Sequence, residues 1–261
     1  MFRPIRNYVR RLLKKSGWIV VHDKVWNEIF YGLPADYDQP HADTYNKVRD
    51  YTMSASTRVV SLCSAIDYLT RNQIEGDIVE CGVWKGGNMM AAIDTLQKNK
   101  SFERSIHLYD TFEGMPAPGP LDVKTGGVSG LGKTAVEIYA NAAPGDFVLC
   151  HSSLEEVKQN IGSLDYPADK IHFIKGMVEE TIPAVMPQKI ALLRLDVCLY
   201  KPVLHILTNL YPQLVSGGVL LISDYGDWKG TRNAVDEYIE KNNIRLFLSR
   251  IDSTGRIGVK A

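Results

Sequence analysis

The stretch Gly76–Gly87, Gly-Asp-Ile-Val-Glu-Cys-Gly-Val-Trp-Lys-Gly-Gly, decides the fold. It predicts a short buried strand over 77–82 that runs directly into a glycine-rich turn, and a helical apolar pattern follows over 87–98. Residues 105–110 predict a second strand, which ends on Asp110. A strand, a glycine turn, a helix and an acid-ended strand are typical of the nucleotide-binding half of a doubly wound α/β sheet.

The rest of the chain continues this alternation of strands and helices. Further strands are predicted over 171–175, 190–196, 219–224, 245–251 and 256–259. The intervening helical patterns favour a mainly parallel sheet, and the turn at 252–255 predicts an antiparallel hairpin for the last two strands. We therefore expect a seven-stranded α/β domain over 51–261, after an irregular extension over 1–50. Prolines and glycines interrupt the alternation over 115–145, which predicts a lid or insertion with a short helix of its own.

Composition excludes some classes of function. The formal net charge of the 261 residues is zero, which removes the simplest argument for nucleic-acid binding. The four cysteines show no paired metal spacing, so reduced thiols in a cytoplasmic enzyme are expected. No apolar run reaches the roughly 18–20 residues of a membrane helix.

The N-terminus carries a local excess of positive charge. Six basic residues precede the first acid, Asp23, and with the nearby leucines they suggest a short basic amphipathic helix over 3–15. Such a helix can make weak contact with an acidic membrane surface. The alternative is a solvated arm, which we favour because about 10 residues bury little apolar area.

Three acids and the glycine turn converge in this fold. Asp110, Asp196 and Asp224 end predicted strands, and the carboxyl ends of parallel strands form the ligand-binding edge of an open α/β sheet. Two carboxylates on neighbouring strands, Asp196 and Asp224, can hold Mg²⁺, which prefers oxygen ligands. One of them can instead act as a general base, or merely cap the helix that follows. These alternatives stay open from the residues alone.

The donor half favours S-adenosylmethionine over a dinucleotide. Glu80 lies on the strand before the turn, and the glycine spacing is not the dinucleotide pattern Gly-x-Gly-x-x-Gly. A sulfonium is already an excellent leaving group. The main task of such a protein is therefore to align the acceptor oxygen with the methyl carbon.

A second glycine motif offers an alternative function. Residues Gly127–Thr134 fit the P-loop pattern Gly-x4-Gly-Lys-Thr, which would make the protein a nucleotide-binding enzyme. A P-loop must leave a buried strand, whereas the preceding residues 118–125 are polar and rich in proline. We therefore favour a flexible lid over the acceptor for this stretch.

Several segments together carry a family resemblance: 51–54, 76–87, 109–116, 190–196, 199–200, 210–212 and 224–226. The chain resembles the macrocin-type sugar O-methyltransferases, the TylF/MycF/NovP family of natural-product enzymes. The resemblance implies a class I methyltransferase (Rossmann-like) fold, S-adenosylmethionine as donor and a hydroxyl on a sugar or glycosylated small molecule as acceptor. It also implies a divalent metal on the strand-end aspartates, and that Thr52 and Met53 close over the cofactor. Together the turn and the resemblance predict these cofactor-binding residues: Thr52, Met53, Glu80, Gly82, Val83, Trp84, Gly86, Gly87, Asp110 and Thr111.

The chain departs from the family pattern on the acceptor side. Cys198 and Lys201 stand where the family usually carries acids, and Ser223 replaces the first acid of a pair before Tyr-Gly. Asp196 and Asp224 remain as catalytic candidates, and with Ser223 as a weak ligand they form the candidate Mg²⁺ site. The lost acids also leave open a catalytically weakened S-adenosylmethionine-binding protein. We further expect a homo-oligomer that binds a saccharide or glycoside acceptor and no nucleic acid.

Overall fold

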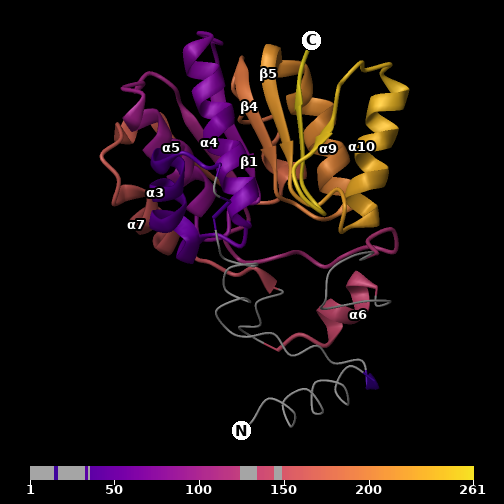
Figure 1. Ribbon diagram of the computed structural model, residues 1–261. Coiled ribbons are helices and arrows are strands. Elements are labelled where there is room, and N and C mark those ends of the chain that lie inside the picture. Colours follow the sequence, from indigo (N-terminus) through magenta and orange to yellow (C-terminus); the bar gives the residue numbers. More distant parts are fainter. Residues whose placement is uncertain (1–14, 17–32, 35, 124–133, 144–148) are drawn as a thin grey trace, which may run out of the picture. The chain divides into compact units, whose positions relative to one another are not determined.

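The computed structural model describes residues 15–16, 33–34, 36–123, 134–143 and 149–261 (Figure 1). The chain divides into two compact units, Met1–Tyr37 and Asp38–Ala261. The expected basic helix over 3–15 lies almost entirely outside the described residues, and so do residues 127–133 of the P-loop pattern. None of the described helices is both long and apolar enough to cross a membrane.

The second unit contains a seven-stranded sheet with the order β3-β2-β1-β4-β5-β7-β6. The strands are β1 (Asp77–Cys81), β2 (Ile106–Asp110), β3 (Ile171–Lys175), β4 (Ile190–Leu195), β5 (Leu214–Ile222), β6 (Ser249–Arg250) and β7 (Arg256–Val259). Strands β1 to β5 pair in parallel, and β7 pairs antiparallel with both β5 and β6. The predicted mainly parallel sheet with a C-terminal antiparallel hairpin is confirmed.

Helices cover both faces of this sheet. The described helices of this unit are α3 (Gln39–Val48), α4 (Ser56–Arg71), α5 (Gly87–Lys98), α6 (Ala135–Ala140), α7 (Leu154–Gly162), α8 (Val178–Thr181), α9 (Tyr200–Leu210) and α10 (Lys229–Lys241). In Figure 1, α4 and α5 lie on one side of the central strands, and α9 and α10 lie on the other. Helices on both faces bury the central strands of a parallel sheet, and all six residues of β4 are buried.

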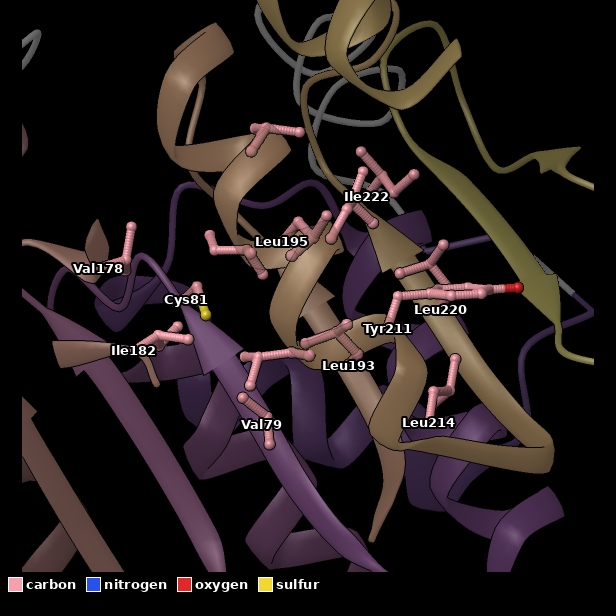
Figure 2. Packing of buried hydrophobic residues seen from close by; sticks show 14 of the residues in the cluster. Val79, Cys81, Val178, Ile182, Leu193, Leu195, Tyr211, Leu214, Leu220 and Ile222 are labelled. Atoms are coloured by element: carbon pink, nitrogen blue, oxygen red, sulfur yellow. The ribbon is translucent and has the colours of Figure 1, made fainter. Parts of the chain in front are cut away.

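The core between the sheet and α9–α10 is built from aliphatic side chains of the central strands (Figure 2). Val79 of β1, Leu193 of β4 and Leu220 of β5 are at most 1% exposed and pack together with the buried face of α9. This packing fixes the carboxyl ends of β1, β4 and β5 relative to one another. The strand ends carry the candidate functional residues.

The compact unit that contains the sheet extends upstream of residue 51, where the sequence analysis starts the domain. Its first helix, α3, begins at Gln39, and Tyr45 and Val48 of this helix are buried. Its N-cap Asp38 accepts a 2.9 Å hydrogen bond from the backbone N–H of His41. The irregular extension therefore ends before α3, because an amphipathic helix with a proline near its start continues the folded unit upstream.

Candidate active site

A cavity of about 350 Å³ opens at the carboxyl ends of the parallel strands. This volume falls in the range of roughly 300–1,000 Å³ that is typical of small-molecule sites. Residues from the β1 turn, the end of β2, the loop after β3 and the ends of β4 and β5 line it: Met53, Ser54, Arg58, Gly82, Val83, Trp84, Tyr109, Asp110, Thr111, Gly114, Met115, Pro116, Cys150, Gly176, Met177, Val178, Glu179, Asp196, Val197, Cys198, Leu199, Pro202, Asp224, Asp227 and Trp228. The predicted convergence of Asp110, Asp196 and Asp224 at one edge is found.

The carboxylate of Asp110 holds the glycine turn against β2. Its Oδ2 accepts hydrogen bonds from the backbone N–H groups of Val83 at 2.6 Å and Trp84 at 3.3 Å. Its Oδ1 accepts a 2.8 Å hydrogen bond from the N–H of Phe112. The acid therefore orders two loops of the cavity wall at once, while its side chain remains on that wall.

Gly82 is required by a close approach of two backbone segments. Its φ of +86° lies in the left-handed region, and a Cβ at this position would lie 2.7 Å from the carbonyl carbon of Asp196. The N–H of Asp196 in turn donates a 2.8 Å hydrogen bond to the carbonyl of Cys81. Gly82 thus lets the β1 turn pack directly on the β4 loop.

A buried guanidinium links the strand ends behind the cavity. Arg194 of β4 is 3% exposed and donates to Glu80 Oε1 at 2.5 Å and to Asp196 Oδ2 at 2.7 Å. Its other terminal nitrogen donates to the hydroxyls of Ser54 at 3.0 Å and Ser223 at 2.9 Å. Arg194 therefore fixes the Asp196 carboxylate relative to β1 and to the loop before α4.

Burial perturbs the acid–base properties of two carboxyl groups here. Desolvation raises the pKa of Glu80 to about 8, and the Arg194 guanidinium opposes this shift. The pKa of Asp224 is raised to about 7, first by desolvation and then by the nearby charge of Asp196. Arg58 of α4 lowers the pKa of Asp224 only in part, because its Nε also lies 3.0 Å from Asp252 Oδ2. A carboxyl with a pKa near neutrality is suited to accept a proton.

The wall beside these acids is largely apolar and sulfur-rich. Met115, Cys150, Cys198 and Trp228 line it, and the Cys198 thiol lies 3.4 Å from the Met115 sulfur. Burial raises the pKa of the Cys198 thiol well above its usual value, so the thiol stays protonated. A cysteine in this state does not replace the charge of the acid expected at this position.

The predicted cofactor-binding residues divide into two groups. The cavity wall contains Met53, Gly82, Val83, Trp84, Asp110 and Thr111. The second group lies behind this wall rather than on it, within the described part of the chain: Thr52, Glu80, Gly86 and Gly87. Gly86 is the N-cap of α5, and Glu80 is fully buried against Arg194. Ser223, the tentative metal ligand, also faces Arg194 rather than the cavity.

Several residues of the cavity wall were not predicted from the sequence. Arg58 and Glu179 lie on helices, and Met115 and Cys150 lie in loops without periodic patterns. Glu179 has a buried oxygen, Oε2, without a hydrogen-bond partner among the described residues. A carboxylate on a cavity wall can accept a hydrogen bond from an amino group of a bound ligand. A helix pattern gives no signal for such a role.

The carboxylates at the cavity provide few protein ligands for a divalent cation. In the ranges that the structure describes, no group of three His, Cys, Asp or Glu side chains is arranged to hold a metal. Asp196 and Asp224 line the cavity and repel each other, so a cation between them would relieve that repulsion. Mg²⁺ commonly binds through one or two carboxylates and keeps several waters. The donor set is therefore compatible with Mg²⁺ that takes its remaining ligands from water or acceptor.

Comparison with known proteins agrees with this geometry. Residues 35–257 match the sequence model of the TylF family, described as macrocin O-methyltransferase. The demethyldecarbamoylnovobiocin O-methyltransferase of Streptomyces niveus is 29% identical over 253 residues, which cover 95% of this chain and 91% of that protein. The 8-demethyl-8-(2,3-dimethoxy-α-L-rhamnosyl)-tetracenomycin-C 4'-O-methyltransferase of Streptomyces olivaceus is 30% identical over 225 residues, or 84% of this chain and 81% of that protein.

Solved structures show the same fold. The O-methyltransferase NovP superposes with a TM-score of 0.69 at 27% identity, over 81% of this chain and 82% of NovP. The calicheamicin methyltransferase CalS11 superposes with a TM-score of 0.58 at 18% identity, over 92% of this chain and 94% of that chain.

Proposed function

Because the chain belongs to the TylF (macrocin O-methyltransferase) family and is thus an S-adenosylmethionine-dependent O-methyltransferase, we propose that its acceptor is a hydroxyl group of a sugar or a glycosylated small molecule. The relatives are named as O-methyltransferases, and the name of the Streptomyces olivaceus enzyme gives a rhamnosyl compound as its substrate. The observation that carries the proposal for this chain is the single cavity at the carboxyl ends of the parallel strands, which Asp110, Asp196 and Asp224 line together.

We propose that the donor binds along the wall between the glycine turn and the loop after β3. Asp110 and Thr111 offer oxygens to ribose hydroxyls, while Met53 and Trp84 supply apolar contact. The carboxylate of Glu179 on the same wall is suited to the adenine amino group. Bound there, S-adenosylmethionine supplies an electrophilic methyl group on a positively charged sulfur.

The acids at the ends of β4 and β5 are suited to accept the proton and to orient the acceptor. We propose that Asp224 takes the proton of the acceptor hydroxyl as the oxygen bonds to the methyl carbon. Its pKa of about 7 is close to neutral pH, so a useful fraction is ionised while its basicity stays high. Asp196 is held by Arg194 and orients the acceptor by accepting a hydrogen bond. The apolar wall excludes water from the reacting oxygen.

Mg²⁺ is a second proposal for the same acids. Asp196 and Asp224 would hold it, and its charge would lower the pKa of the acceptor hydroxyl. Ser223 faces Arg194, so we place it outside this ligand set. The Asp224 base and the metal predict different responses to a chelator.

The test is methyl transfer from radiolabelled S-adenosylmethionine to a panel of phenyl glycosides, measured with excess EDTA and with added Mg²⁺. We expect label in a glycoside, at a sugar hydroxyl identified by NMR. Full activity in EDTA would assign the proton to Asp224 alone, whereas activity that requires Mg²⁺ would support the metal. Tight donor binding without transfer to any glycoside would contradict the acceptor class and favour a catalytically weakened binding protein.

A further inference from the structure

The beginnings of α9 and α10 are capped by a loop that is distant in the sequence. Neither helix receives a side-chain hydrogen bond from its own N-cap residue, Leu199 or Trp228. Instead the N–H of Tyr200, the first residue of α9, donates a 2.7 Å hydrogen bond to Oδ1 of Asp122. The first N–H groups of a helix need such partners, and a carboxylate there is favoured by the positive end of the helix dipole.

The same loop also caps α10. The N–H of Lys229, the first residue of α10, donates a 2.8 Å hydrogen bond to the carbonyl of Val123. Gly230 follows it, and a Cβ at Gly230 would overlap Asp122 Oδ1 and lie 3.1 Å from the nitrogen of Tyr200. Only glycine leaves room for the carboxylate between the two helix starts. We call residues 115–123 the capping strap.

Asp122 is buried, yet its partners are backbone amides. It is 5% exposed, and its second oxygen accepts a 2.7 Å hydrogen bond from the N–H of Gly119 within the strap. A buried carboxylate is costly unless its hydrogen bonds and local dipoles compensate it. The amides of Tyr200 and Gly119, together with the positive end of the α9 dipole, supply that compensation, so the side chain is committed to this one position.

The other end of the strap lies on the cavity. Met115 and Pro116 line the acceptor side, and the N–H of Met115 is fixed to the carbonyl of Leu149 at 2.7 Å. The Met115 sulfur contacts Cys198, two residues after Asp196. The strap is thus held at both ends, and its fixed course sets the wall that faces the catalytic loop.

We propose that Asp122 is a positioning residue for the acceptor: by capping α9 beside α10 it fixes the capping strap, and with it the wall formed by Met115 and Pro116. This rests on the proposed function, since the wall matters only if an acceptor binds there. The proposed donor wall is formed by other residues, so we expect S-adenosylmethionine binding to be independent of Asp122.

The experiment compares Asp122→Ala, Asp122→Asn and Gly230→Ala with the wild type. With phenyl α-L-rhamnopyranoside as acceptor, we expect KM to rise about tenfold or more in Asp122→Ala, because small misplacements of a bound substrate can cost up to roughly a hundredfold. The calorimetric Kd for S-adenosylmethionine should stay within about twofold of the wild type. Asp122→Asn keeps one carbonyl oxygen, so its acceptor KM should lie between those of the wild type and Asp122→Ala. Equal loss of donor and acceptor affinity, or an unchanged acceptor KM, would overturn the proposal.

A double variant separates positioning from general damage. Gly230→Ala introduces a Cβ into Asp122 Oδ1, so it should raise the acceptor KM in the wild type but have little further effect in Asp122→Ala. Asp38→Ala is the matched control, because Asp38 also caps a helix through a backbone N–H, away from the cavity. It should leave both affinities unchanged. Additive effects of the Gly230 and Asp122 changes would contradict the assignment.

Hydrogen exchange decides the outcome if a variant fails to fold or the wild type does not methylate the rhamnoside. In the wild type the amides of Gly119, Tyr200 and Lys229 should be protected, since each donates in the strap or to it. Unprotected amides at these positions would contradict the attachment of the capping strap through Asp122 and Val123. Protected amides without rhamnoside methylation would support this attachment and would contradict the proposed acceptor class instead.

Discussion

Arg194 is the residue on which the arrangement of the acids depends. It lies in the most buried strand, where every neighbour along the chain is aliphatic, and it contacts an acid of β1, an acid after β4 and two hydroxyls. Burying a guanidinium is favourable only with such complete pairing. The resulting network holds Asp196 in one orientation, and it explains why Glu80 and Ser223 serve the site from behind the cavity wall.

Replacing this arginine should therefore destabilise the fold strongly. In Arg194→Met the Asp196 carboxylate and the Glu80 carboxyl lose the guanidinium that they share, and breaking a buried pair costs about 3–5 kcal/mol of the free energy of unfolding. Urea unfolding at neutral pH measures the loss. The control is Lys189→Met, which breaks the exposed pair between Lys189 and Glu75 and should have little effect. A similar small effect for both variants would contradict the structural role of Arg194.

Asp224 predicts a pH dependence of methyl transfer. Its folded pKa is raised to about 7, and a base works only when deprotonated, so kcat/KM for the acceptor should fall as pH drops through about 7. The profile is to be measured in EDTA, so that metal binding does not contribute. The Kd for S-adenosylmethionine should remain flat over the same range. A kcat/KM that is constant between about pH 6 and 8 would exclude Asp224 as the base.

At the scale of elements, the sequence predicted the bounds of those strands and helices that have a clear periodic pattern of apolar residues. Strands 171–175 and 256–259 and helix 87–98 have the predicted bounds. Strand β5 begins earlier than predicted, at Leu214, because the apolar run that predicted it starts only after Gly217 and Gly218, where the pairing with β4 is irregular. The strand predicted over 245–251 pairs only over Ser249–Arg250, since pairing depends on a partner that local sequence does not reveal.

The glycine turn gives a prediction at this scale. Gly82→Ala places a Cβ on the backbone of Asp196 at a positive φ, so the β1 turn must move away from the β4 loop. We expect a loss of a few kcal/mol in the free energy of unfolding, together with weakened donor binding. Calorimetry with S-adenosylmethionine and thermal unfolding measure both.

A second glycine provides the control. A Cβ at Gly162, at the end of α7, meets nothing within 4 Å, so Gly162→Ala should be neutral or stabilising by up to about 1 kcal/mol. If Gly82→Ala behaves like Gly162→Ala, the close approach between the two strand ends is not a requirement of the fold.

At the scale of the molecule, the site is where the topology brings strand ends together. That rule sufficed to predict that Asp110, Asp196 and Asp224 lie together, and all three line one cavity. It could not find Arg58, Glu179 or the capping strap, because these depend on side-chain contacts between segments far apart in the chain. The bond between Asp122 and Tyr200 joins residues 78 positions apart and leaves no local pattern. The acceptor side is thus the part least readable from the sequence.

The central claim is that one cavity has a donor half at Asp110 and a proton-accepting group at Asp224. The most direct test measures S-adenosylmethionine affinity by calorimetry and methyl transfer to a phenyl glycoside on the same samples of Asp110→Asn and Asp224→Asn. We predict that Asp110→Asn loses donor affinity by about tenfold or more, whereas Asp224→Asn binds the donor normally and loses about a hundredfold or more of its turnover. Normal turnover in Asp224→Asn, or normal donor binding in Asp110→Asn, would contradict this division of the cavity.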